Sequence, residues 1–556
     1  MRTMQKIVKL LFAALVVLAA TSCSKVEDKM QELIPGDAIV VGRLDVPKFI
    51  EHSGIEMKDG KIEFPEYFVK TLKENGVKSG KIDDAAEKLA DCGIDFDKPA
   101  YGFATEAALE NEEDVFQGVF LFAIGDEKKL VSFIEEETDE SFKEKDGMQC
   151  LQADRDRTSF VIDGDILIIG ISKNDVNPVK LVQKMKDQKE NIKDNESAMK
   201  ALDTSDDFNL WVDAKKVMEK TSGEIEREMS YLPSGQQELM RALLSLTEAK
   251  AYALHATLAD DEFKVKYEMD MSGNGDFEKL VEKVLDEPSA ELLELMPAAK
   301  NMATFSLSLN GAGIADLDIF KKGINQIGLP AEDKDMLVSF VKSVKGPLTL
   351  GVASNAFTEK DYCIVLAVKA GQANAVFTKY TQGLDEYVQY GYAEKVGNEY
   401  RMKQDDGIMA LGCKGDVLYM KMYTSEYSKK ATEDSDAKSI IGSSKVSGIA
   451  KCTVDGMDGF LSIKSMSPVE TSGIFYVKKG GEKMKPLDTV WFFYKLGKYI
   501  DENFNQRSYS SYDYDYDYDS YGSDDVVEDE VEAARAAAQE AAQEAVERAA
   551  AAAYAY

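Results

Sequence analysis

The stretch TSFVIDGDILIIG, residues 158–170, places two apolar runs on either side of Asp163-Gly164. Glycine adopts the left-handed backbone of a tight turn without steric cost, so this dipeptide is typical of a β-hairpin. The spacing predicts adjacent antiparallel strands near 158–162 and 165–170. Hairpin-linked strands with intervening helices indicate an α+β fold and not a doubly wound parallel sheet.

The hairpin is one of four blocks that recur, in the same order, in the second half of the chain. We interpret the matches as an internal duplication, because self-similarity in a fixed order marks repeat architectures. Two unrelated halves of similar composition are the alternative. The matched runs are 32–35 with 294–297, 99–104 with 347–353, 119–124 with 363–368, and 163–168 with 414–419.

Short apolar or alternating runs predict the remaining elements of the first repeat. We expect two tandem α+β repeats, residues 23–290 and 291–507, each a mainly antiparallel sheet with packed helices. The strands 251–258 and 262–271 are expected to have counterparts at 448–453 and 459–463. The other expected elements are strands near 38–44, 100–105, 117–124 and 148–152, a helix over 126–137, and a helical region over 222–250 that is interrupted at Pro233.

The first 22 residues have the pattern of a targeting segment. Three basic residues precede an apolar run, 10–20, that is too short to span a bilayer but fits a signal peptide. Small residues directly before Cys23 resemble a lipobox, so Cys23 is the predicted lipidation site and the first residue of the mature chain. An ordinary secretory peptide with an incidental cysteine is the alternative. Ser24 lacks the aspartate of inner-membrane lipoproteins, and this similarity to known sorting signals implies the outer membrane.

The lipobox, the opening Ile34-Pro35-Gly36-Asp37-Ala38 with Arg43-Leu44-Asp45 behind it, and the duplicated body resemble a family of Bacteroidales lipoproteins. That family is known as a domain of unknown function, and the resemblance covers about Cys23 to Asn505. It implies a location and an architecture. It implies no activity, cofactor or catalytic residue.

The end of the chain differs in composition from the body. Residues 508–525 are of low complexity, with tyrosine and aspartate alternating over 512–519, and their dense like charge predicts a disordered linker. Weak calcium or partner binding is the alternative there. Residues 526–556 are rich in alanine, glutamate, glutamine and arginine, which predicts a helix. The acidic tail is thus a candidate contact for a protein or envelope partner.

Composition limits the chemistry of the chain. Its 556 residues carry a formal net charge of -33, and phosphate binding needs a basic surface, so we expect no nucleic-acid partner. The two histidines, His52 and His255, are expected to be structural, and we predict no catalytic residue, metal or cofactor. The run Asp270 to Gly275 resembles the start of an EF-hand, but Val281 stands where the bidentate glutamate belongs.

Five cysteines other than Cys23 are scattered without a CxxC pair, which favours buried thiols over a zinc site or a disulfide framework. One chance disulfide is the alternative. They are Cys92, Cys150, Cys363, Cys413 and Cys452.

Three classes of function fit these observations. The leading one is a non-enzymatic binding or scaffold protein, held at the outer membrane through lipidated Cys23, on the periplasmic face or the cell surface. The second is a periplasmic carrier or chaperone for hydrophobic cargo. The third is a carboxylate-dependent hydrolase, although acidic pairs are so frequent in this chain that spacing alone does not nominate a catalytic pair.

Overall fold

The computed structural model describes most of the chain from Ser24 to Ile500, and the described residues up to Tyr499 belong to one compact unit. The predicted signal peptide, Cys23 and the tail after Ile500 lie outside the described residues. The described ranges are 24–58, 61–105, 116–153, 157–172, 177–232, 248–272, 275–358, 361–404 and 407–500, together with residues 237, 240, 241 and 244.

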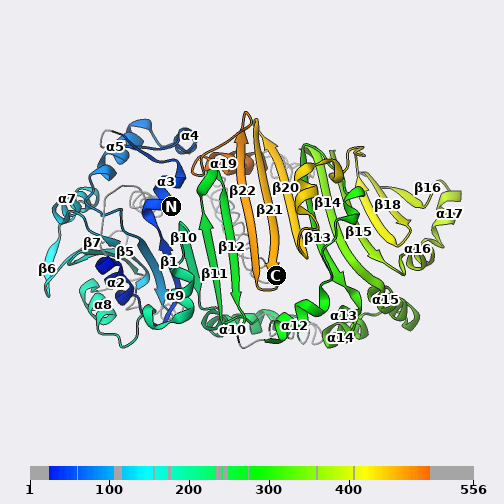
Figure 1. Ribbon diagram of the computed structural model, residues 1–556, viewed down its shortest axis with the longest axis horizontal. Helices are drawn as coiled ribbons and strands as arrows, with labels where there is room; N and C mark the ends of the chain where they lie inside the picture. Colours follow the sequence, from blue (N-terminus) through cyan, green and yellow to red (C-terminus); the bar gives the residue numbers. More distant parts are fainter. Residues whose placement is uncertain are drawn as a thin grey trace, which may run out of the picture. The chain divides into compact units, whose positions relative to one another are not determined.

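Ten strands from the first half of the chain form what we call the first arm of an antiparallel sheet (Figure 1). They are β1 (Ala38–Leu44), β4 (Ala100–Thr105), β5 (Phe116–Ala123), β6 (Lys143–Lys145), β7 (Met148–Ala153), β8 (Thr158–Asp163), β9 (Ile166–Ser172), β10 (Phe208–Val212), β11 (Ala251–Thr257) and β12 (Phe263–Asp270). They pair in the order β6-β7-β8-β9-β5-β4-β1-β10-β11-β12.

The second arm contains ten strands from the second half of the chain. They are β13 (Asn301–Asn310), β14 (Val344–Thr358), β15 (Asp361–Ala370), β16 (Ala393–Val396), β17 (Glu399–Gln404), β18 (Gly407–Lys414), β19 (Val417–Tyr423), β20 (Val446–Val454), β21 (Met457–Ser467) and β22 (Glu470–Lys479). They pair in the order β16-β17-β18-β19-β15-β14-β13-β20-β21-β22.

The two arms join into one sheet, because β12 pairs with β22 from Phe263–Phe475 to Glu268–Glu470. The α+β class and the antiparallel sheet are therefore confirmed, although a separate sheet was expected in each half. Short additional strands are β2 (Glu56–Lys58) with β3 (Lys61–Glu63), and β23 (Glu482–Lys483) on β22.

Local sequence explains the elements that were predicted well. The 158–170 hairpin forms as β8 and β9, with Gly164 at a φ of 61° in its turn. The predicted helix 126–137 is α7 (Glu127–Thr138), and it begins where the Asp126 side chain accepts hydrogen bonds from the backbone N–H groups of Lys128 and Lys129.

One expectation about the strands was wrong. By position in the sheet, β11 and β12 correspond to β21 and β22, so the expected counterparts 448–453 and 459–463 are displaced by one strand. The cause is that the short β10 and the Ser/Gly-containing β22 give weak apolar patterns and were not predicted. The helical region expected over 222–250 is confirmed where the structure describes it: α10 (Ala214–Ser230) covers 222–230, and residues 237, 240, 241 and 244 are helical, while 233–236 lie outside the described residues.

One face of the sheet is covered in both arms by short helices. In the first arm the cover is α2 (Ser24–Leu33), α8 (Pro178–Lys186), η1 (Ile192–Asp194) and α9 (Glu196–Leu202). In the second arm the cover is η3 (Glu291–Glu294), η4 (Ala431–Glu433) and α18 (Ser435–Ile440). The buried cores on this face therefore have similar helical covers.

The opposite face is covered unevenly. The first arm buries it under α3 (Val46–Ser53), α4 (Glu66–Glu74), α5 (Ser79–Ala90) and α7. In the second arm, α15 (Ala331–Ser343), α16 (Ala373–Thr381) and α17 (Leu384–Gln389) pack at one margin, and α19 (Thr489–Ile500) packs at another. The remaining helices are α12 (Gly275–Val284), α13 (Gly311–Ala315), α14 (Asp318–Gln326) and η2 (Ala259–Asp261).

Candidate functional site

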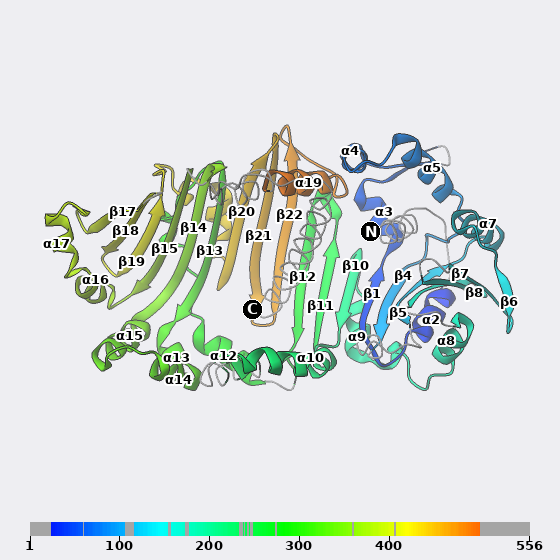
Figure 2. The same cartoon turned by 180° about the vertical axis from the view of Figure 1, so that it is seen from behind.

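The second arm exposes an apolar sheet surface, which we call the apolar face. Seven large side chains, each between 36 and 43% exposed, define it: Phe305, Leu350, Leu366, Met420, Met422, Leu461 and Ile463. Figure 2 shows β13, β14, β15 and β19 with no labelled helix in front of them. Monomeric proteins rarely leave a large contiguous apolar surface in water, so such a surface marks an interaction site.

Strand register places these side chains in rows that cross the strands. Phe305 lies opposite Leu350, Leu350 opposite Leu366, and Leu366 opposite Met420. On the other side of β13, Phe305 lies opposite Gly448, and Gly448 opposite Ile463. Because directly opposed residues share a face of the sheet, this row is continuous from β19 to β21.

A second row runs parallel to the first, two residues along each strand. It contains apolar residues and no charged residue: Met409, Met422, Ile364, Val352, Ala303, Ala450, Leu461 and Phe475. Phe493 of α19, which is 52% exposed, stacks on Phe475 with the ring centroids 4.9 Å apart. The apolar face is thus continuous with the interface between α19 and the sheet.

The exposed row belongs to the same sheet face that helices bury in the first arm. Ile463 lies opposite Gly473, and Gly473 opposite Val265. From Val265 the row continues through Ala256 and Phe208 to Leu44. Leu44 packs against the core that α3, α4, α5 and α7 cover. One continuous face of the sheet is therefore covered by helices in the first arm and exposed to solvent in the second.

Strand β13 reverses the usual distribution of polar and apolar side chains. Thr304, Ser306 and Ser308 are at most 2% exposed, whereas Phe305 between them is 43% exposed. Ser306 forms a hydrogen bond with Thr349 of β14, with 3.0 Å between the hydroxyl oxygens. Small side chains suit the buried face because the backbone packs closely there: a Cβ on Gly351 would lie 2.7 Å from the Met296 sulfur.

Sequence reasoning missed the apolar face. Alternation of Ser and Thr with Phe and Leu along 302–309 would assign the apolar residues to the core. The available signal was a set of apolar residues at every second position within each of β13, β14, β15 and β19. Only the pairing of the strands shows that these side chains lie on one surface.

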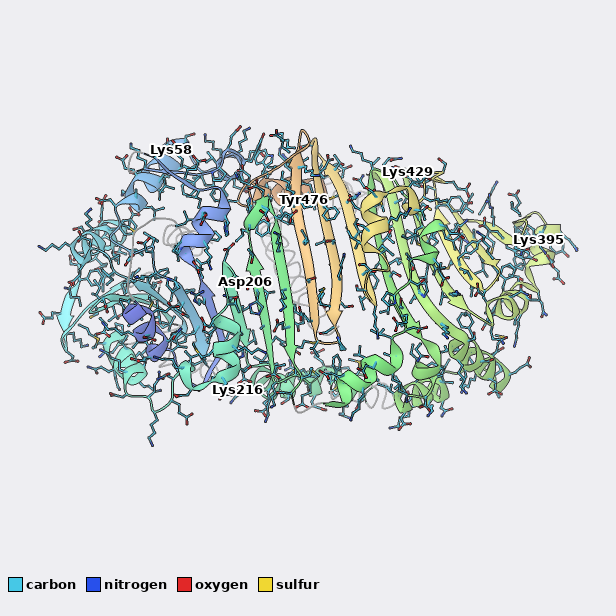
Figure 3. The ribbon with its side chains drawn as sticks, viewed as in Figure 1. Lys58, Asp206, Lys216, Lys395, Lys429 and Tyr476 are labelled. Atoms are coloured by element: carbon cyan, nitrogen blue, oxygen red, sulfur yellow. The ribbon has the colours of Figure 1, made fainter. Side chains whose placement is uncertain are left out.

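Both histidines lie beside the consecutive aspartates Asp206 and Asp207, in the loop before β10 (Figure 3). His52 Nδ1 lies 2.9 Å from the carboxylate oxygens of Asp207, which is fully buried. His255 Nδ1 lies 2.7 Å from Asn209 Oδ1, and burial lowers the pKa of His255.

The aspartates are also held by the backbone and by hydroxyl groups. The Leu258 N–H donates to Asp207, and the Thr257 hydroxyl donates to Asp206, each over 2.6 Å. The cluster therefore ties α3, β10 and β11 together. A Ser-His-Asp arrangement would need a serine on a histidine nitrogen, and the described contacts of these histidines include none.

A polar hollow of about 510 Å³ lies at the upper edge of the second arm, where Lys429 is labelled in Figure 3. Lys300, Lys429 and Glu426 line it, together with Asp361 and Tyr427. Asp361 accepts hydrogen bonds from the Tyr427 hydroxyl and from the backbone N–H groups of Asn355 and Ala356. This carboxylate therefore holds the surrounding loops together.

The other residues singled out from the sequence have structural surroundings or lie outside the described part of the chain. All five body cysteines are free thiols, and burial raises the pKa of Cys92, Cys363 and Cys452 to about 11. Asp270 accepts a hydrogen bond from the Ser272 N–H, while Gly273 and Asn274 fall outside the described residues. Cys23, 508–525 and 526–556 also fall outside them.

The described residues present neither a candidate metal site nor a candidate membrane-spanning helix. No cluster of three or more His, Cys, Asp or Glu side chains in this part of the chain is arranged to hold a metal ion. No helix in it combines the length and apolar character needed to cross a bilayer.

Comparison with known proteins gives distant structural similarity alone. No protein-family model and no curated protein sequence matches the chain. Crystal form I of TP0453 matches at a TM-score of 0.24 and 12% identity, covering 43% of this chain and 77% of that one. Crystal form III of TP0453 matches at a TM-score of 0.25 and 10% identity, covering 47% and 88%.

Proposed function

We propose that this protein is a non-enzymatic binding or scaffold protein of the cell envelope that holds a partner on its apolar face. The observation that carries the proposal is the row Phe305, Leu350, Leu366 and Met420, which is exposed and free of charge. Burying apolar surface contributes about 25 cal/mol per Å², so covering this row would drive association.

The proposal includes attachment to the outer membrane through lipidated Cys23. It is supported by the basic start, the short apolar run and the small residues before Cys23. Substituting Cys23→Ala should move the protein from the membrane fraction to the soluble fraction, whereas the control Cys452→Ala should leave it with the membrane. Unchanged retention of the Cys23→Ala chain would refute the anchor.

We also propose that the body consists of two related repeats, 23–290 and 291–507. What supports this is the identical strand order on either side of the β12–β22 pair. Divergence of two such copies would account for a partner-binding surface in one arm and a covered surface in the other.

Binding to the apolar face can be tested with the neutral fluorescent dye Nile red. We expect the double variant Leu350→Lys/Leu366→Lys to lose most of the dye fluorescence, because two charges would interrupt the row. The control Tyr390→Lys changes an exposed aromatic residue on the segment after α17 and should keep the signal. Equal fluorescence from the double variant and the unmodified chain would contradict the proposal.

A further inference from the structure

The size of the apolar face restricts what can cover it. Strands lie about 4.8 Å apart, so the eight strands from Phe475 on β22 to Met409 on β18 span roughly 34 Å. Adjacent rows on one face lie about 7 Å apart. The uncovered surface is thus a strip much longer across the strands than along them.

These dimensions match one α-helix. A helix rises 1.5 Å per residue and is about 10 Å wide with its side chains, so about 22 residues would span the strip. A helix about 10 Å wide laid along the strip would cover roughly 34 by 10 Å, or about 340 Å², which is less than half of the ~800 Å² per partner of a standard protein interface and is typical of a weak, transient complex.

The interface with α19 already shows a helix on this surface. α19 buries Phe492 and Trp491 against β20, β21 and β22, with Phe492 lying over Gly459. Its neighbour Phe493 stacks on Phe475 and remains half exposed, at the margin of the apolar face. A second helix laid beside α19 would continue an interface that the chain itself builds.

Charge distinguishes between possible helical partners. The chain has a formal net charge of -33, so long-range attraction favours a partner with basic residues on its polar side. The same charge opposes the approach of a second copy. We infer that the apolar face binds a cationic amphipathic helix of about 22 residues from a partner protein; this inference rests on the proposed binding function.

Two isoleucines provide a matched pair of variants. Ile463 of β21 and Ile474 of β22 are each 36% exposed and lie on adjacent strands. Ile463 lies opposite Gly473 on the apolar face, whereas Ile474 lies opposite Ser462 and Lys264 on the other face. Ile463→Lys should disrupt the proposed site, and Ile474→Lys makes the same chemical change outside it.

The test uses the full chain and a fluorescein-labelled 22-residue Leu/Lys peptide with helical periodicity, followed by fluorescence polarisation. A scrambled peptide of the same composition is the second probe. We expect the amphipathic peptide to bind at least tenfold more tightly than the scrambled one. Ile463→Lys should weaken its binding at least tenfold, and Ile474→Lys should change it less than twofold.

Four outcomes would overturn the inference. Equal binding of the two peptides would do so, as would unchanged peptide binding by Ile463→Lys. Dimers of the unmodified chain that Ile463→Lys abolishes, measured by sedimentation, would assign the face to a second copy. Peptide binding that tightens tenfold in a Val531→Asp/Val546→Asp chain would assign it to the chain's own tail. In each case, a loss of Nile red fluorescence in Ile463→Lys but not in Ile474→Lys would still support the proposed binding function. Equal fluorescence from these two variants would refute both the helix inference and the proposed binding function.

Discussion

The two arms have the same strand order, yet they differ in what lies over one face of the sheet. In the first arm, α3, α4, α5 and α7 bury Phe160 of β8, which is 1% exposed. In the second arm, the same face presents Phe305 and Leu350 to solvent. The sheet does not itself determine whether this face is core or surface. The segments between the strands determine it, because those after β13 pack at one end and not over the strands.

Among substitutions that only remove atoms, the largest expected effect contrasts a covered phenylalanine with an uncovered one. Phe160→Ala should lower the free energy of unfolding by about 3–5 kcal/mol, since it leaves a cavity in a packed core. Phe305→Ala should cost much less, because its side chain already contacts water. Urea denaturation of both variants measures the difference. Equal losses would mean that Phe305 is buried in solution.

A smaller effect concerns the segment that completes the cover of the first arm. Asp488 accepts a hydrogen bond from the Phe68 N–H over 2.8 Å, and Leu487 packs into the first-arm core. Asp488→Ala should cost about 1–3 kcal/mol, because it removes the acceptor of this buried hydrogen bond. Asp488→Asn keeps an acceptor and should cost less. A loss from Asp488→Asn as large as that from Asp488→Ala would contradict this account.

The Asp488 carboxyl group should also make the stability of the chain depend on pH. Burial raises the pKa of Asp488, so the folded chain binds this proton more tightly than the unfolded chain does. Its contribution to stability is therefore present at low pH and is lost as the pH rises through the folded-state pKa. Asp488→Asn should flatten that part of the pH profile, measured by thermal unfolding. An unchanged profile would show that the folded-state pKa is not raised.

His255, in the first arm, should make stability depend on pH in the opposite direction to Asp488. Burial lowers its pKa, so the unfolded chain binds the proton more tightly, and stability is lost as the pH falls below about 6.5. His255→Gln should reduce this loss of stability between pH 7 and pH 5. His52→Gln is the comparison, because His52 pairs with the buried Asp207 carboxylate. A His255→Gln profile identical to that of the unmodified chain would refute this role.

The smallest expected change in stability comes from a lysine placed on the uncovered face, compared with the same substitution on the covered face. Leu366→Lys should change the free energy of unfolding by no more than about 0.5 kcal/mol, because the side chain is exposed and has room to reach water. Leu167→Lys places the same residue on the covered face of the first arm, where Leu167 is 1% exposed, and should prevent stable folding. Circular dichroism during thermal unfolding measures both. A destabilised Leu366→Lys would show that something covers the face.

Much of the local structure could be predicted from the sequence. The expected strands 38–44 and 100–105 have the bounds of β1 and β4, and the 158–170 hairpin forms as expected. These elements depend on local apolar runs and on turns such as Asp163-Gly164, which the chain encodes within a few residues. The convergence of His52 and His255 on Asp206 and Asp207 could not be predicted, because it depends on contacts between distant segments.

The sequence by itself determined the α+β class, the hairpins and the apolar character of each strand, because these depend on neighbouring residues. Only the tertiary structure decided which side of β13 is buried. Its alternation of Thr304, Phe305 and Ser306 fits either orientation, and the packing of Met296 against Gly351 selects the face with small side chains. The junction of β12 with β22 was likewise decided by pairing between remote segments, and it is this pairing that makes one face continuous across both arms.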